Sequence, residues 1–301
     1  MKRGCGAFLF VVLIVGALAA ILWWKWDPIY ERFTRKAVVA EQQKCTERIQ
    51  ELQKLLSQKQ PIQQQQPQKQ LLPTARFTEV FGPNSPIAQG RSPQRLDCQQ
   101  LEDTLRSFCR YLDGNQALKT HGISQDSWPF FTGILASLDR HKPTISGEAY
   151  RAPILLQNSF FFFRLLRQKK IAVIRDIINS EADLAEPLMG TLYHWLIRKC
   201  GDLGDSAESL KFLYRYAGFF LQTLGGHSYL IRRDSKIALL TMYYSVLAVH
   251  QANEHSLNEE GIDLRFFLPI LFSGVQSRND LLYSEDYLQT LSNLQLKYFG
   301  S

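Results

Sequence analysis

The sequence lacks the compact motifs that identify most enzymes and metal proteins. Its 301 residues contain no His-Glu-x-x-His, no P-loop or Rossmann glycine spacing, no nucleophile elbow around a serine and no EF-hand loop. No reaction can be named without such a motif, and we expect no catalytic residue, no metal and no cofactor. These absences do not exclude an enzyme, but they favour a non-enzymatic protein.

Cysteine is scarce, and the five residues present show neither CxxC spacing nor a compact disulfide framework: Cys5, Cys45, Cys98, Cys109 and Cys200. Cys98 and Cys109 would lie about 16 Å apart along a continuous helix, too far to form a bridge. We therefore expect both to pack in the core. No Asn-x-Ser/Thr glycosylation acceptor with a permitted middle residue occurs either, so glycosylation gives no support for secretion.

Alternating strand patterns and fixed-period repeats are also missing. From Arg95 onward the apolar residues recur with helical spacing instead, and one face of the first such segment holds Leu101, Leu105, Phe108 and Leu112. We predict an all-α fold for residues 95–301, a soluble bundle of about seven to nine helices. Beyond the first helix, the pattern places helices near 126–141, 146–168, 170–180, 183–200, 206–224, 229–254, 262–276 and 284–298.

The predicted bundle has no net charge, although the whole chain carries +7. Residues 1–94 hold 13 Lys/Arg against 6 Asp/Glu, and residues 95–301 hold the other 22 of each sign. The basic character therefore belongs to the N-terminal third, where it can contact anionic lipid headgroups. A domain without a positive field is unsuited to nucleic acid, so we expect no nucleic-acid partner.

An apolar run from Ala7 to Trp24 follows the short basic N-terminus and is about the length of a membrane-crossing helix. Tryptophans and a tyrosine mark its far edge, as is common at the headgroup layer: Trp23, Trp24, Trp26 and Tyr30. Residues 1–26 are predicted to be an uncleaved signal anchor whose residues 7–24 contact lipid. The alternative is a signal peptide cleaved after Ala19, since Ala17-Leu18-Ala19 has the small-x-small form of a cleavage site.

The two sides of this span give opposing signals about orientation. A short basic N-terminus favours export of the remaining chain, whereas basic residues just after the span favour retention: Lys25, Arg32, Arg35, Lys36 and Lys44. Three thiols in the predicted bundle are also awkward for an oxidising compartment. We expect a single-pass protein of a bacterial inner membrane, with its C-terminal domain exported to the periplasm.

Between the span and the bundle, residues 27–58 are predicted to form a basic stalk helix, and residues 59–94 a Gln/Pro-rich linker. A narrow apolar seam on the stalk has coiled-coil spacing and would pair two parallel copies: Val38, Cys45, Ile49, Leu52 and Leu56. A lone solvated helix explains the stalk equally well. Within the linker, Arg76 to Phe81 is apolar enough for a short docking motif, although plain linker is the simpler interpretation.

Two clusters in the predicted bundle have residue types suited to ligands. A glycine pair precedes an anion-binding candidate set, which comprises His227, Arg232, Arg233 and Lys236. His250 and Glu254 would share a helix face, as a pair of metal ligands does, but no third ligand is evident. Structural ion pairs and a polar helix end are the competing interpretations, and we favour them.

Together these features predict a membrane-anchored helical module that binds an unknown protein partner or acts as a scaffold, and that forms a homodimer if the stalk seam is real. The resemblance to envelope scaffolds and assembly factors of Gram-negative bacteria is one of layout alone. The rival hypothesis is an enzyme or ligand sensor with an anion or metal site inside the helical domain.

Overall fold

The computed structural model describes residues 74–145, 152–198, 200, 206–222 and 236–300, all within one compact unit that spans residues 70–301. In these ranges the chain forms nine α-helices and no strand, which confirms the all-α prediction for the part described. The helices are α2 (Thr74–Phe81), α3 (Cys98–Gly114), α4 (Ser127–Arg140), α5 (Ala152–Ser180), α6 (Ala185–Ile197), α7 (Ser206–Phe220), α8 (Lys236–Glu254), α9 (Leu268–Gln276) and α10 (Ser284–Phe299).

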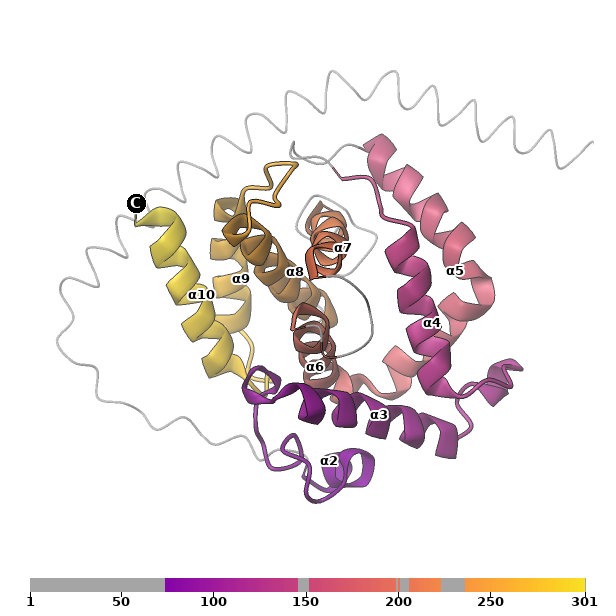
Figure 1. Ribbon diagram of the computed structural model, residues 1–301. Coiled ribbons are helices and arrows are strands. Elements are labelled where there is room, and N and C mark those ends of the chain that lie inside the picture. The colour runs from indigo at the N-terminus through magenta and orange to yellow at the C-terminus, as the bar shows by residue number, and fades with distance from the viewer. Residues whose placement is uncertain (1–73, 146–151, 199, 201–205, 223–235, 301) are drawn as a thin grey trace, which may run out of the picture. The chain divides into compact units, whose positions relative to one another are not determined.

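Helix α8 forms the centre of the domain (Figure 1). It packs against α6, α7 and α9, and the side chains that it buries point to every side of the helix. A helix that buries residues on all sides is stable only when other helices surround most of it. The apolar stretch from Ile237 to Val249 makes up most of α8. It lies in the core because nearly all of its residues are apolar, and not because one face of the helix is apolar and the other polar.

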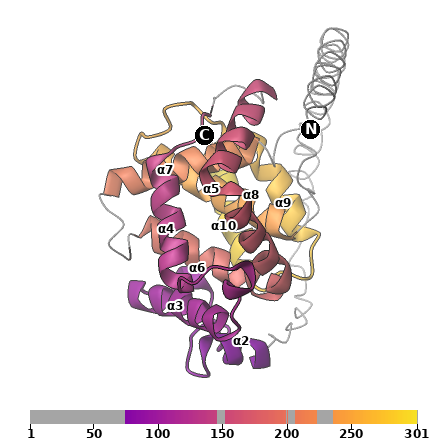
Figure 2. The ribbon, with the colours of Figure 1, turned by 90° about the vertical axis from the view of Figure 1, so that its right-hand side faces the viewer.

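Helices α9 and α10 pack together as a hairpin at one side of the domain (Figure 1). A 3-10 turn, Leu264–Phe266, precedes α9 and also contacts α10. In an antiparallel hairpin the first residues of one helix lie beside the last residues of the other. The start of α9 therefore lies beside the end of α10, at the end of the domain opposite α2 (Figures 1 and 2).

The folded domain begins earlier than composition predicts, because residues 74–94 are part of it rather than linker. Helix α2 packs on α3, and its Phe77, Val80 and Phe81 join a core that includes Ile87 and Leu96. Arg76 on α2 also pairs with Glu181 and, at 3.4 Å, with Asp183 just before α6. The segment from Arg76 to Phe81 thus docks onto this chain's own domain.

Helix α5 contains a break at Arg167, whose φ of 59° and ψ of 160° are not helical. The sequence pattern likewise separates a helix ending at 168 from one starting at 170. Beyond the break, Lys169 donates a hydrogen bond of 2.8 Å to the carbonyl of Gly122, which holds the second half of α5 against the connection before α4.

The predicted anchor, the stalk and its seam residues Val38, Cys45, Ile49, Leu52 and Leu56 lie outside the described residues, as does the linker up to residue 73. Among the helices that are described, none is long and apolar enough to cross a membrane.

Candidate functional site

The predicted anion-binding set is represented by Lys236 alone, because His227, Arg232 and Arg233 lie outside the described residues. Lys236 begins α8, and its ammonium lies 2.7 Å from a carboxylate oxygen of Glu186 on α6. It also donates a hydrogen bond of 2.8 Å to the carbonyl of Asp280. The charge of Lys236 is therefore engaged within the fold.

Glu186 is the fully buried partner in this ion pair and connects three elements. Besides Lys236, it accepts hydrogen bonds of 3.0 Å from the backbone N–H groups of Leu282 and Tyr283, between α9 and α10. A carboxylate without water needs charged and hydrogen-bonded partners, and three donors meet that need here. We call this arrangement the Glu186 clasp, since it holds α6, α8 and the α9–α10 hairpin together.

His250 and Glu254 on α8, the pair weighed above as metal ligands and not favoured, are likewise occupied by protein contacts. His250 Nδ1 lies 3.0 Å from the hydroxyl of Tyr298, and the carboxylate of Glu254 pairs with Lys297 at 2.7 Å. The hydrogen bond from Lys297 lowers the pKa of Glu254, while burial and the Lys297 charge lower the pKa of His250. Across the described ranges, no three His, Cys, Asp or Glu side chains come together as a metal site would require.

Hydrogen bonds continue from this pair toward α7. The side-chain amide of Asn253 donates to the Tyr298 hydroxyl at 2.8 Å, and the amide of Asn258 donates to Asn253 at 2.7 Å. The Tyr214 hydroxyl donates in turn to Asn258 at 2.7 Å. Asn258 also accepts from the backbone N–H of Ile262 at 2.9 Å. The polar residues at the end of α8 therefore fix the loop that leads to α9, which is a structural role.

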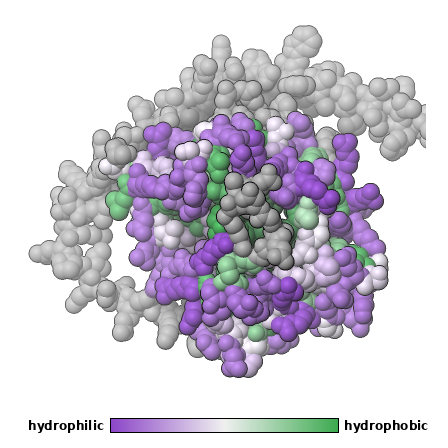
Figure 3. Space-filling model, in the orientation of Figure 1, coloured by the Kyte–Doolittle hydropathy of each residue, from purple (hydrophilic) through white to green (hydrophobic). Residues whose placement is uncertain are grey.

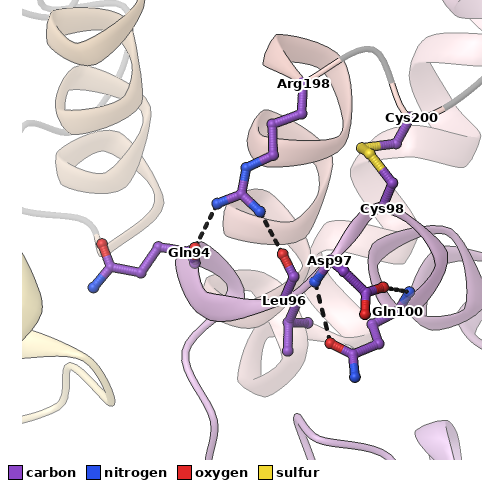
Figure 4. The surroundings of a disulfide bond; sticks show 7 residues. All are labelled: Gln94, Leu96, Asp97, Cys98, Gln100, Arg198 and Cys200. Carbon is purple, nitrogen blue, oxygen red and sulfur yellow. Dashed lines mark hydrogen bonds between the residues drawn. A yellow bond between two sulfur atoms is a disulfide. The ribbon is translucent and has the colours of Figure 1, made fainter.

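A disulfide joins Cys98, the first residue of α3, to Cys200 beyond the end of α6, with their Cα atoms 4.9 Å apart (Figure 4). The expected core packing therefore fails for Cys98, which is exposed, whereas Cys109 is a buried thiol. Burial raises the pKa of Cys109 to about 12. Sequence reasoning missed this bridge because its two cysteines are 102 positions apart in the sequence.

The chain around the disulfide is held by further contacts (Figure 4). The guanidinium of Arg198 donates to the carbonyl oxygens of Gln94 and Leu96. Asp97 caps α3 by accepting from the N–H of Gln100 at 2.8 Å, and Gln100 accepts in return from the N–H of Asp97 at 3.1 Å. The start of α3 is thus fixed to α6 by both covalent and polar contacts.

His194 on α6 gives the stability of the domain a pH dependence. Burial and the nearby Arg198 charge lower its pKa from the ordinary 6.5 to about 4. The unfolded chain then binds a proton between these values while the native chain does not, so the free energy of unfolding falls as the pH drops from 6.5 to 4. The full shift corresponds to about 3 kcal/mol. We expect His194→Gln to remove that part of the slope in urea titrations across this pH range.

The exposed His255 offers a matched control for this titration. His255→Gln makes the same substitution at an exposed position and serves as the reference variant in the same urea titrations. Equal slopes for wild type and His194→Gln would contradict the assigned role of His194.

An apolar surface remains after the polar groups are accounted for. Four of the five large apolar side chains exposed in the described part of the chain lie at the meeting point of the start of α9 and the end of α10: Phe266 (54% exposed), Ile270 (49%), Leu296 (73%) and Phe299 (44%). We call these four residues the apolar patch. In Figure 3, hydrophobic side chains interrupt a mostly hydrophilic face at its left edge, where α10 lies.

The charged residues around the apolar patch are paired with one another. Arg265 binds Asp263 at 2.8 Å, and Lys297 binds Glu254 at 2.7 Å. The surroundings of the patch are therefore mixed in sign, and a strongly charged ligand would gain little from them. Apolar side chains inside a neutral polar rim are typical of a protein-binding surface.

No protein-family model, no curated protein and no solved structure matches this chain.

Proposed function

We propose that this chain is a membrane-anchored helical protein-interaction or scaffold module of a bacterial envelope, with its domain in the periplasm. The observation that carries the proposal is the apolar patch. Large apolar side chains exposed together at one end of a domain gain free energy when a partner covers them. The polar clusters that would suit a small ligand are, where described, engaged in the Glu186 clasp and the Tyr298 contacts.

Two features support the membrane and export parts of the proposal. The apolar run of residues 7–24 has the length and the aromatic edge of a signal anchor. The Cys98–Cys200 disulfide suits an oxidising compartment, since cytosolic thiols are usually kept reduced. Two of the three cysteines that counted against an oxidising compartment therefore support export instead.

Binding through the apolar patch is expected to depend on its side chains without a matching effect on stability. Removing two apolar anchors of about 1–2 kcal/mol each lowers association by about 30-fold or more. Ile270→Ser/Leu296→Ser should therefore lose nearly all protein adducts that form from a photo-cross-linking amino acid placed at Phe299, within the patch, when the full chain is in its membrane. Its unfolding temperature should stay within about 3 °C of wild type, because both side chains are already largely in water.

Ile178, the fifth exposed apolar residue, lies on α5 and provides a matched control. Ile178→Ser removes the same kind of side chain and should keep the wild-type adducts. If both variants keep them, the apolar patch is not the binding surface. A saturable thermal stabilisation of the purified chain by phosphates, nucleotides or metal ions would instead favour the rival ligand sensor.

A further inference from the structure

We propose that the occupant of the apolar patch is a second copy of this chain, packed patch against patch about a two-fold axis. This step rests on the proposed function and names the partner of the same surface. It follows from the area of the patch, its position in the domain relative to Thr74 and the paired charges around it.

The area decides what kind of contact the patch can make. Side chains of this size present on the order of 200 Å² each, so four that are roughly half exposed offer about 400 Å². A stable interface between freely diffusing proteins buries about 800 Å² on each partner. The patch alone is therefore too small to hold a soluble partner tightly, but it suffices for a partner that is already held close.

The stalk predicted from the sequence would supply such a partner. Its seam, with Ile49 and Leu52 among its residues, has the spacing to pair two parallel copies. Only residues 59–73 separate the predicted stalk from α2, and a chain of about 15 residues spans roughly 20 Å. A short tether of this kind sets an effective concentration in the millimolar range, at which a weak contact is occupied.

The position of the patch is compatible with parallel stalks. Helix α10 starts near the chain before α3, where its Asp286 pairs with Arg95 at 2.8 Å, and it ends at the opposite end of the domain from α2 (Figure 1). A two-fold axis running along α10 would place the two patches against each other. It would also leave both Thr74 residues on the same side of the pair, as two parallel stalks require.

The charges beside the patch fit an isologous contact. In such a contact the same surface patch is used on both copies. A patch surrounded by charges of one sign would therefore repel its copy. The Arg265–Asp263 and Lys297–Glu254 pairs give the surroundings of the patch both signs. A second copy can therefore approach without a like-charge penalty.

The test is photo-cross-linking of the full chain in its native membrane, with a benzophenone amino acid replacing Leu296 or Ile270, and with Ile178 as the matched position. We expect an adduct of twice the mass of the chain at positions 296 and 270, more abundant by about tenfold or more than at position 178. Placing Ile49→Asp and Leu52→Asp in the stalk should lower the yield of that adduct by about tenfold or more, since it removes the tethering.

The other outcomes separate this inference from the proposed function. An adduct with a different protein at positions 296 and 270 would overturn the second copy while supporting an interaction module. The absence of protein adducts at both positions would overturn both. An unchanged dimer yield in the stalk variant would overturn the tethering step, and with it the claim that the patch needs a partner held nearby.

Discussion

Removal of the Cys98–Cys200 disulfide is expected to lower the free energy of unfolding by about 2–5 kcal/mol. The bridge closes a loop with a sequence separation of 102, so it restricts the unfolded chain far more than a local bridge would. The chain-entropy model assigns about 4.7 kcal/mol to a loop of this size. We expect the double variant Cys98→Ser/Cys200→Ser to show this loss as an earlier urea midpoint.

Reductant and the third cysteine of the domain provide the controls. Wild type in excess dithiothreitol should unfold at nearly the same urea concentration as the double variant, whereas the variant itself should not respond to reductant. Cys109→Ala removes a thiol that forms no bridge in the described structure and should keep the sensitivity to reductant. A wild-type midpoint that reductant leaves unchanged would contradict the structural role of the disulfide.

The second large effect is expected at the Glu186 clasp. Glu186→Gln removes the buried charge opposite Lys236 and puts an amide donor where two backbone N–H groups require acceptors. Breaking a buried ion pair by changing one partner costs about 3–5 kcal/mol. We expect a loss at the lower end of that range, because Lys236 is partly exposed and keeps its hydrogen bond to the carbonyl of Asp280. The measurement is again the free energy of unfolding in urea.

A double-mutant cycle isolates the pair itself. Lys236→Met alone should also destabilise strongly, because it leaves the Glu186 carboxylate without its cation. Glu186→Gln/Lys236→Met should be more stable than the sum of the two single changes implies. Lys297→Met breaks the solvent-exposed pair with Glu254 and should have a much smaller effect. Strict additivity of the two clasp variants would contradict a direct Glu186–Lys236 interaction.

Local sequence patterns predicted those parts of the fold that depend on local interactions. Leu101 and Leu112 lie on one face of a segment with a 3.6-residue period, and both are buried in α3. The break near residue 168 was likewise visible in the sequence, as the apolar pattern restarts after the basic residues Lys169 and Lys170. Such features follow from the neighbours along the chain, so sequence alone contains them.

The prediction from composition was wrong where contacts with residues distant in the sequence stabilise a helix. The segment from Thr74 to Phe81 lies among prolines and glutamines, and composition therefore predicted linker. Its Phe77 is nevertheless fully buried, because α3 and the chain near Leu96 cover it. Eight residues could not form a stable helix alone, so packing decides this element.

The candidate site was beyond sequence reasoning for the same reason. Cys98 and Cys200 come together only because the start of α3 meets the end of α6, and Glu186 meets Lys236 only because α6 crosses the start of α8. The apolar patch has no signature of its own either. Phe266 and Leu268 are both large apolar residues of the same short segment, but Phe266 is 54% exposed and Leu268 is fully buried. Exposure depends on which neighbours cover a side chain, and no local pattern encodes that.

The central claim is that a membrane anchor holds this domain outside the cytoplasm. It is tested most directly by paired reporter fusions after Ser301, one active only outside the cytoplasm and the other only inside. We predict activity from the external reporter and none from the internal one, together with a Cys98–Cys200 bridge that resists alkylation until reductant is added. Activity of the internal reporter alone would contradict the claim, because it would place the domain in the cytoplasm.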